Sequence, residues 1–364
     1  MSTANDWIFG RIGFVIIGYV AARATMLMSP DIENILNSSN PLIVNTSEVL
    51  DSLQYRTGFA LMQYSSAGAV WVLKTIIQLI INIAVFFVLY SLMPSVTRAV
   101  DRLSKKAGSV SVTIAGVIGY LLFAAGSITM VILTFIPASG RLWEGIKILL
   151  SDRIFVLSFV NSLIYSILGC IIYGFTAFML ACPLSTGSKA YSFLLVILLS
   201  LTNNFIGEYL FFRSLGMFDT ALPVIISSGL SITGAFALHF CVCAKLKQCS
   251  FEFADYVKAS LLPLLTLVII AFIVNWGGYL YQMIYTARAD HYGIGMYGRM
   301  LLYGGLGAAT QNASAGETVQ LDPAVIKSAF VFLSSIVPAV LGAIIIALNK
   351  FLPLTAFTAQ VRKG

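Results

Sequence analysis

Long apolar stretches are the feature that most limits how this chain can fold. Eight stretches are long and apolar enough to be considered as membrane spans, although Arg23 interrupts the first and the fifth is short. They cover residues 9–28, 70–94, 111–136, 154–182, 190–206, 221–244, 260–283 and 326–349. A helix that crosses a bilayer needs about 20 such residues, whereas a β-barrel strand alternates over about 10. We therefore expect an all-α polytopic membrane protein with about eight transmembrane helices.

The overall composition excludes several other classes of protein. Hydrophobic residues make up 59% of the 364 residues and charged residues only 10%, against about 25% charged in an average soluble domain. A soluble domain with so few polar groups could not cover its own surface. The chain is therefore not expected to be a disordered segment, a secreted disulfide scaffold or an ordinary cytosolic enzyme.

The distribution of charge predicts the orientation in the membrane. With the N-terminus inside, twelve basic and four acidic residues lie on the inner side, and ten basic and eleven acidic residues lie on the outer side. The opposite orientation would put the basic cluster around residues 98–106 outside, against the positive-inside rule. We expect a multi-pass protein of the cell membrane with both termini cytoplasmic. The net charge of +7 is then a topology signal with some attraction to membrane lipid, and no nucleic acid partner is expected.

The residues that usually carry catalysis or bind metals are scarce. The chain has five cysteines and two histidines, His239 and His291, and Cys241 and Cys243 are too close in sequence for a usual zinc pair. It also lacks a glycine-rich phosphate loop followed by lysine. We expect no enzymatic activity, no catalytic residues, no metal and no cofactor on this chain.

From about residue 111 onward, a series of short motifs resembles one known family. The most specific is Leu215-Gly216-Met217-Phe218-Asp219-Thr220, followed by Ala221-Leu222-Pro223. The others, in chain order, are Pro137–Gly140, Phe159–Ser162, Tyr173–Ala181, Thr186–Lys189, Asn275–Leu280, and a last span with Pro338 before the terminal Arg362-Lys363-Gly364. Together they resemble the inner-membrane permeases of maltose-type carbohydrate ABC transporters. The resemblance covers some two-thirds of the sequence.

This resemblance implies a domain organisation, a function and a set of partners. Residues 111–364 would form a six-span permease core, and residues 1–110 an N-terminal extension of two spans with an outer loop. The chain would form the translocation path of an ATP-driven carbohydrate importer together with a second permease subunit. A cytoplasmic ATPase dimer would hydrolyse ATP, and an extracytoplasmic sugar-binding protein or lipoprotein would deliver the substrate.

The inner loop at residues 245–258 departs from the family pattern. In the family, this loop carries a Glu-Ala-Ala motif and a later glycine, and it forms a short coupling helix that docks on the ATPase. Here it is several residues shorter and has no glycine. The residues that could serve this coupling role are Phe251, Glu252, Phe253, Ala254, Asp255 and Tyr256. The alternative interpretation is an interfacial loop whose aromatic residues lie among the lipid headgroups.

Two groups of residues are candidates for the translocation path. Asn203, Asn204 and Glu208 form a polar cluster near the outer end of the fifth span, and polar groups at membrane depth tend to face a cavity or another helix. Trp276 and Tyr279, near the outer end of the seventh, suit sugar binding. The alternative interpretations are a solvated span end for the first group and an aromatic belt for the second.

Two other functional classes remain open from the sequence. The shortened inner loop also suits a degenerate, non-transporting relative that acts as a membrane scaffold or regulatory subunit. A proton- or ion-coupled secondary carrier is less favoured, because that class usually places acidic residues within its spans and these spans carry almost none.

Overall fold

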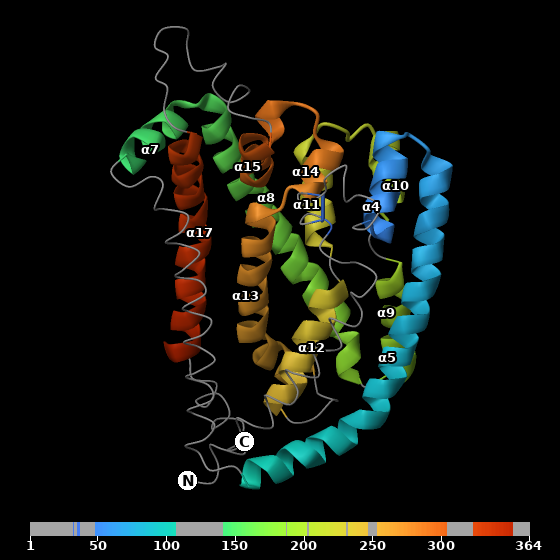
Figure 1. Ribbon diagram of the computed structural model, residues 1–364. Coiled ribbons are helices and arrows are strands. Elements are labelled where there is room, and N and C mark those ends of the chain that lie inside the picture. The colour runs from blue at the N-terminus through green and yellow to red at the C-terminus, as the bar shows by residue number, and fades with distance from the viewer. Residues whose placement is uncertain are drawn as a thin grey trace, which may run out of the picture. The chain divides into compact units, whose positions relative to one another are not determined.

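The computed structural model describes residues 32, 35, 36, 48–106, 141–186, 188–201, 204–230, 232–246, 253–303 and 323–351. Within these residues the protein is helical and contains no strand (Figure 1). The α-helices are α4 (Leu50–Tyr55), α5 (Tyr64–Lys106), α7 (Leu142–Ser151), α8 (Arg153–Ala181), α9 (Lys189–Ser200), α10 (Phe205–Ser214), α11 (Ala221–Gly229), α12 (Ile232–Leu246), α13 (Phe253–Gly277), α14 (Leu280–Tyr285), α15 (Ile294–Tyr303) and α17 (Pro323–Phe351). Short turns of other helix types are η1 (Arg56–Ala60), η3 (Pro183–Thr186) and η4 (Ala289–His291).

The described helices agree with the prediction of an α-helical membrane protein. Five of them are long and apolar enough to cross a membrane, or six if one bent pair counts as a single span. The five are Tyr64–Val85, Arg153–Ala181, Ala221–His239, Phe253–Gly277 and Ala324–Ile344. Each overlaps a span expected from the sequence. The expected spans at 9–28 and 111–136 lie outside the described residues.

The fifth expected span, 190–206, is part of the bent pair. Ala190–Ser200 and Phe205–Ser214 meet at 83°. Asn204 precedes the second helix and caps it, because its side-chain oxygen accepts a hydrogen bond from the Gly207 amide at 3.0 Å. A capping asparagine satisfies an otherwise unpaired amide at a helix start, so the apolar run can break here and continue in a new direction.

The chain forms two compact units, both discontinuous in sequence. Unit 1 contains Met1–Phe123, Phe175–Phe218 and Leu230–Leu264, and unit 2 contains Ala124–Gly174, Asp219–Gly229 and Leu265–Gly364. The helices α8 and α13 contribute residues to both units. Unit 1 contains described helices of the expected N-terminal extension together with residues of the expected permease core, and the expected boundary at residue 110 stays a prediction.

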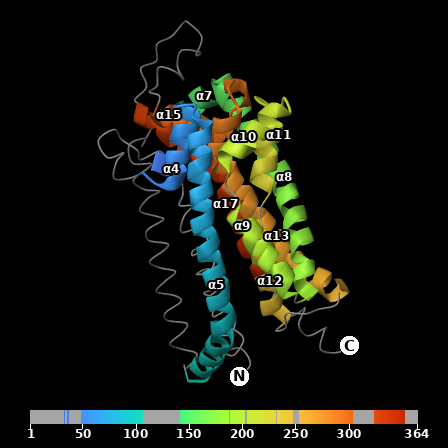
Figure 2. The same ribbon diagram turned by 90° about the vertical axis from the view of Figure 1, so that its right-hand side faces the viewer.

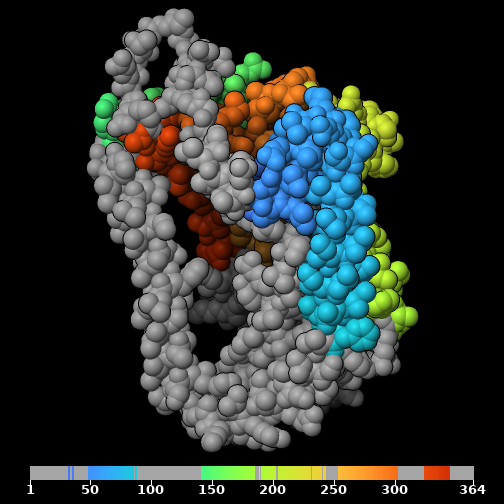
Figure 3. All heavy atoms as spheres, turned by 45° about the vertical axis from the view of Figure 1, so that its right-hand side comes forward, coloured from blue at the N-terminus to red at the C-terminus, as the bar shows by residue number. Residues whose placement is uncertain are grey.

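In unit 1, α5 is the central element. It packs against α4, η1, α9 and α10 (Figure 2), and Figure 3 shows the blue atoms of α4 directly against the lighter blue atoms of α5. Large apolar residues on α5 are exposed, including Leu73, Ile76 and Ile80. Exposed apolar residues on a long helix are expected where lipid, rather than water, surrounds the protein.

In unit 2, an aromatic and aliphatic core joins α7, the first part of α8, the end of α13, α15 and α17. Its residues include Phe155, Trp276, Tyr297 and Phe330. The Phe155 ring meets those of Tyr297 and Phe330 edge-on, at centroid distances of 5.4 and 6.3 Å. Such edge-on pairs add to the stabilisation from apolar burial. This core holds the ends of several helices in fixed positions around the segment described next.

Candidate functional site: a polar cluster at residues 285–294

A tight turn before α11 contains the most specific motif of the sequence, Leu215–Thr220. Gly216 has φ +68° and Asp219 has φ +60°, so both adopt the left-handed backbone conformation. Glycine adopts this conformation freely, and aspartate does so more readily than most residues. The Asp219 amide donates to the Tyr285 carbonyl at 2.9 Å, which ties the turn to the end of α14.

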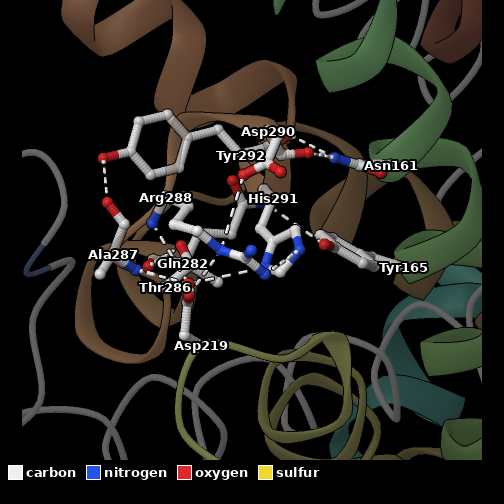
Figure 4. Close-up of polar contacts among 10 residues, drawn as sticks. All are labelled: Asn161, Tyr165, Asp219, Gln282, Thr286, Ala287, Arg288, Asp290, His291 and Tyr292. Carbon is white, nitrogen blue, oxygen red and sulfur yellow. Dashed lines mark hydrogen bonds and ion pairs between the residues drawn. The ribbon is translucent and has the colours of Figure 1, made fainter.

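The Asp219 carboxylate organises the segment that follows α14 (Figure 4). Its Oδ1 atom accepts hydrogen bonds from the amides of Ala287 and Arg288, at 3.0 and 3.2 Å. Its Oδ2 atom accepts from the Arg288 guanidinium Nε at 2.8 Å. One carboxylate thus fixes both the backbone and the side chain of Arg288.

These contacts determine the charge state of Asp219. Partial desolvation raises the pKa of its carboxyl, but the hydrogen bonds from the amides of Ala287 and Arg288 and the positive charge of the guanidinium together outweigh desolvation. The pKa therefore lies below the ordinary value of 3.8, because every one of these donors favours the ionised form. Asp219 is a fixed negative charge at neutral pH.

His291 lies beside this ion pair. Its Nε2 atom is 3.0 Å from the Arg288 guanidinium, and its Nδ1 atom is 3.5 Å from Asp219 Oδ1. A neutral imidazole that accepts from Arg288 through Nε2 carries its proton on Nδ1, which then points toward the carboxylate. Aspartate, arginine and histidine thus form one connected polar cluster.

Three side chains of α8 hold the backbone of the same segment. Asn161 Nδ2 donates to the carbonyls of Asp290 and Tyr292 at 2.7 and 3.0 Å. The Tyr165 hydroxyl donates to the His291 carbonyl at 3.0 Å (Figure 4), and the Ser162 hydroxyl accepts from the Ile294 amide at 2.7 Å. The spacing of these residues places them on neighbouring turns of one helix.

Gln282 on α14 completes the cluster. Its Oε1 atom accepts from the Gly293 amide at 2.8 Å, and its Nε2 atom donates to the Gly278 carbonyl at 3.1 Å. A Cβ atom at position 293 would lie 2.5 Å from Gln282 Nε2 and 2.6 Å from Ser162 Oγ, so a side chain there would displace the groups that bind this backbone. The backbone of residues 285–294 is therefore held from α8, α14 and the Asp219 turn together.

The polar cluster consists of hydrogen bonds and ion pairs that fix one backbone segment. Among the described residues, no group of three or more His, Cys, Asp or Glu side chains could hold a metal ion. The charged atoms of Asp219 and Arg288 are already paired with each other. The arrangement therefore presents a fixed and partly exposed pair of charges, Asp219 and Arg288.

The two aromatic path candidates, Trp276 and Tyr279, lie in unit 2 and are both buried. The Trp276 indole donates to the Ser334 carbonyl at 2.8 Å and meets the Phe159 ring edge-on. The Arg299 guanidinium lies over the Tyr279 ring, with its Cζ atom 4.8 Å from the ring centroid. Both residues support the end of α13, next to the polar cluster.

The polar path candidates belong to unit 1. Asn204 caps α10, and Glu208 lies in the first turn of that helix. A negative charge in this position interacts favourably with the positive end of the helix dipole. Asn203 lies outside the described residues.

Of the coupling candidates, Phe251 and Glu252 also lie outside the described residues. Phe253, Ala254 and Asp255 occupy the first turn of α13 and are exposed. Tyr256 instead is fully buried, with its ring 6.5 Å from those of Phe178 and His239. Phe253 and Tyr256 therefore do not share one exposed apolar face.

A second polar group, in unit 1, was not singled out from the sequence. Lys74 on α5 forms an ion pair with Asp51 on α4, and both side chains are buried, with exposed fractions of 3% and 2%. Further along α5, Gln78 donates to Asn82 and Asn82 donates to Ser200 on α9, each at 2.8 Å. The signal that could have revealed it is the four-residue spacing of Lys74, Gln78 and Asn82 within an apolar run, which places all three on one helix face.

Comparisons with known proteins found no matching family model, no matching curated protein and no matching solved structure.

Proposed function

We propose that this chain is a transmembrane permease subunit of an ATP-driven carbohydrate importer, and that it forms the translocation path with a second permease subunit. In this proposal it has eight spans, six of which form the transport core, and both termini lie in the cytoplasm of a cell membrane. ATP hydrolysis takes place on a cytoplasmic ATPase dimer. A sugar-binding protein or lipoprotein delivers the substrate from outside.

The observation that carries the proposal is the convergence of separate motifs on one segment. Asn161 and Ser162, Asp219, and the Asn275–Leu280 run all belong to the pieces that resemble carbohydrate permeases. The first three contact residues 285–294 directly, and the fourth continues into α14, whose Gln282 does so as well. Motifs far apart in sequence that meet in space are better explained by a shared structural role than by chance similarity.

A pull-down tests the assembly. The tagged full chain is extracted in mild detergent, and the copurifying proteins are identified by mass spectrometry, with an unrelated tagged polytopic protein expressed at the same level as the control. Recovery of a second permease, an ATPase and a sugar-binding protein is the expected result. Recovery of none of the three would contradict the proposal.

The path role of Asn204 needs two variants, because this residue also caps α10. Asn204→Leu removes both the cap and the amide, whereas Asn204→Ser retains a capping oxygen and removes only the amide. If Asn204 lines the path, both variants lose sugar uptake in cells. If its role is only to cap the helix, uptake survives in Asn204→Ser and falls in Asn204→Leu.

The second candidate function is a degenerate, non-transporting scaffold or regulatory subunit. The shortened inner loop without glycine favours it. The same pull-down separates the two functions, because a scaffold would recover the second permease without an ATPase. Phe253→Ala provides a second test, since a working coupler would lose ATPase recovery or sugar-stimulated ATP hydrolysis while a scaffold would lose neither.

A further inference from the structure

The short helix α7 has two different faces. Gly145, Ile146 and Leu149 are buried, whereas Trp143 and Leu150 are exposed, with exposed fractions of 65% and 56%. Trp143, Lys147 and Leu150 follow the spacing i, i+4, i+7, which places them along one side of the helix. An exposed tryptophan and leucine on either side of a lysine are unusual on a surface that faces only water.

The buried face of α7 packs on the beginning of α17. A Cβ atom at Gly145 would lie 2.9 Å from the Ala329 Cβ and 3.0 Å from the Val325 carbonyl, so the two helices approach closely. Val325 and Ala329 are in the first turns of the candidate span Ala324–Ile344. Figure 1 shows α7, in green, beside the end of α17 where that span begins. This contact places α7 at the level where α17 enters the membrane.

The C-terminal end of α7 is fixed at the same level. Only Asp152 separates it from α8, whose span begins at Arg153. Asp152 Oδ1 accepts from the Ile154 amide at 2.9 Å, which caps α8, and Oδ2 accepts from the Tyr297 hydroxyl at 2.7 Å. Desolvation and this carboxylate both raise the pKa of Tyr297, so the phenol remains protonated and donates to Asp152.

An element that is fastened to the ends of two membrane spans lies at the membrane boundary. The exposed residues of α7 suit that position. Tryptophan is enriched at the headgroup level, where its ring contacts acyl chains and its N–H contacts water or lipid oxygens. Lysine and arginine extend from such helices toward phosphate groups, and Lys147 and Arg153 are exposed on α7 and at its C-terminal end, whereas the exposed Arg141 pairs with Glu144 at 3.1 Å.

We propose that α7 is an interfacial helix whose exposed side binds phospholipid. Trp143 and Leu150 enter the boundary between headgroups and acyl chains, and Lys147 pairs with lipid phosphate. The lipid contact holds the α7–α8 junction and the first turns of α17 at a fixed depth. Because this junction bonds to Tyr297 on α15, the contact also limits movement of the segment next to the polar cluster.

Quenching of tryptophan fluorescence by brominated lipid tests the proposal on the full chain. The protein is reconstituted in nanodiscs of phosphatidylcholine that is unlabelled, brominated near the headgroup end of the acyl chain, or brominated near its methyl end. The difference between wild type and Trp143→Phe isolates the emission of Trp143. We expect a larger loss of this emission with the shallow bromine than with the deep bromine.

Trp276→Phe is the matched control. Trp276 is in the core of the same unit, so its difference spectrum should change little with either brominated lipid. Equal or stronger quenching of Trp143 by the deep bromine would overturn the interfacial depth. No quenching by either lipid would overturn lipid binding, and a change in Trp143 emission only when a partner protein is added would assign this side of α7 to a protein interface.

Discussion

The two units each contain an ion pair, and the two pairs differ in almost every physical respect. Lys74 and Asp51 in unit 1 are 3% and 2% exposed, whereas Arg288 and Asp219 in unit 2 are 61% and 22% exposed. The buried pair is almost fully withdrawn from water, so each charge depends on the other for its stabilisation. The exposed pair is screened by solvent and contributes little free energy as an ion pair. Asp219 acts mainly by accepting hydrogen bonds from backbone amides.

The two pairs therefore have different roles. The buried pair affects the stability of the fold, whereas the exposed pair fixes the conformation of a surface segment. In unit 1, the desolvation cost makes the loss of one partner severe, although the intact pair adds little net stability. In unit 2, breaking the charge pair costs little free energy of unfolding. Removing the Asp219 carboxylate, however, takes away the acceptor that organises residues 285–294. Substitutions at the buried pair should therefore cost much more stability than substitutions at the exposed pair.

Replacing one partner of the buried pair should have the largest effect. Lys74→Met leaves Asp51 as a buried charge without its cation, and we expect a loss of about 3–5 kcal/mol in the free energy of unfolding. Reversible unfolding in mixed micelles measures it. The control Lys74→Met/Asp51→Leu removes both charges and should recover most of the loss. A single variant as stable as wild type would show that water reaches the pair.

Breaking the polar ladder between α5 and α9 should have a smaller effect. Asn82→Leu removes the hydrogen bonds to Ser200 and Gln78, for an expected loss of about 1–2 kcal/mol. A double-mutant cycle with Ser200→Ala measures the part that belongs to the Asn82–Ser200 bond. A coupling energy of zero in the same unfolding assay would mean that this bond does not stabilise the packing of α5 on α9.

Removing the charge of Asp219 should cost about 1 kcal/mol. Asp219→Asn is the informative change, because asparagine also tolerates φ +60° and can still accept a hydrogen bond. The main effect should be local, with faster hydrogen exchange at the amides of Ala287 and Arg288. Unchanged exchange at these two amides would contradict the organising role of the carboxylate.

The same variant tests the pH dependence of the cluster. Because the pKa of folded Asp219 lies below 3.8, its contribution to stability is fully present above that pH and is lost as the pH falls through the folded pKa. Wild type should therefore keep slow exchange at Ala287 and Arg288 down to about pH 4 and lose it in stronger acid. In Asp219→Asn, this acid-dependent change should disappear.

The smallest effect is expected for Arg288→Gln. It removes the exposed cation but leaves the amides of Ala287 and Arg288 bonded to Asp219, so we expect at most about 0.5 kcal/mol in the free energy of unfolding. Comparing this loss with that of Lys74→Met measures directly how much burial changes the cost of removing one charge of a pair. Similar losses in the two variants would mean that burial does not distinguish the two pairs.

Part of the candidate site could be predicted from the sequence. Asn161 and Asp219 belong to motifs that carry the family resemblance, and both lie in the polar cluster, but of the predicted site residues that the structure describes only Trp276 and Tyr279 lie near it. The partners of these motifs were not identifiable, because Asn161 bonds carbonyls of residues 290 and 292, more than a hundred residues away. Arg288 and His291 lie in a stretch without a motif of its own.

The length of the apolar runs alone indicates an α-helical membrane protein. Runs of apolar residues long enough to cross a bilayer leave few alternatives, because an exposed backbone in lipid must satisfy its hydrogen bonds within a helix. The tertiary structure alone decided which polar residues inside those runs meet. The spacing of Lys74, Gln78 and Asn82 defines a face of α5, but only packing brings Asp51 and Ser200 to that face. Periodicity is a local property of the chain, whereas the partner of a buried charge depends on how distant helices pack together.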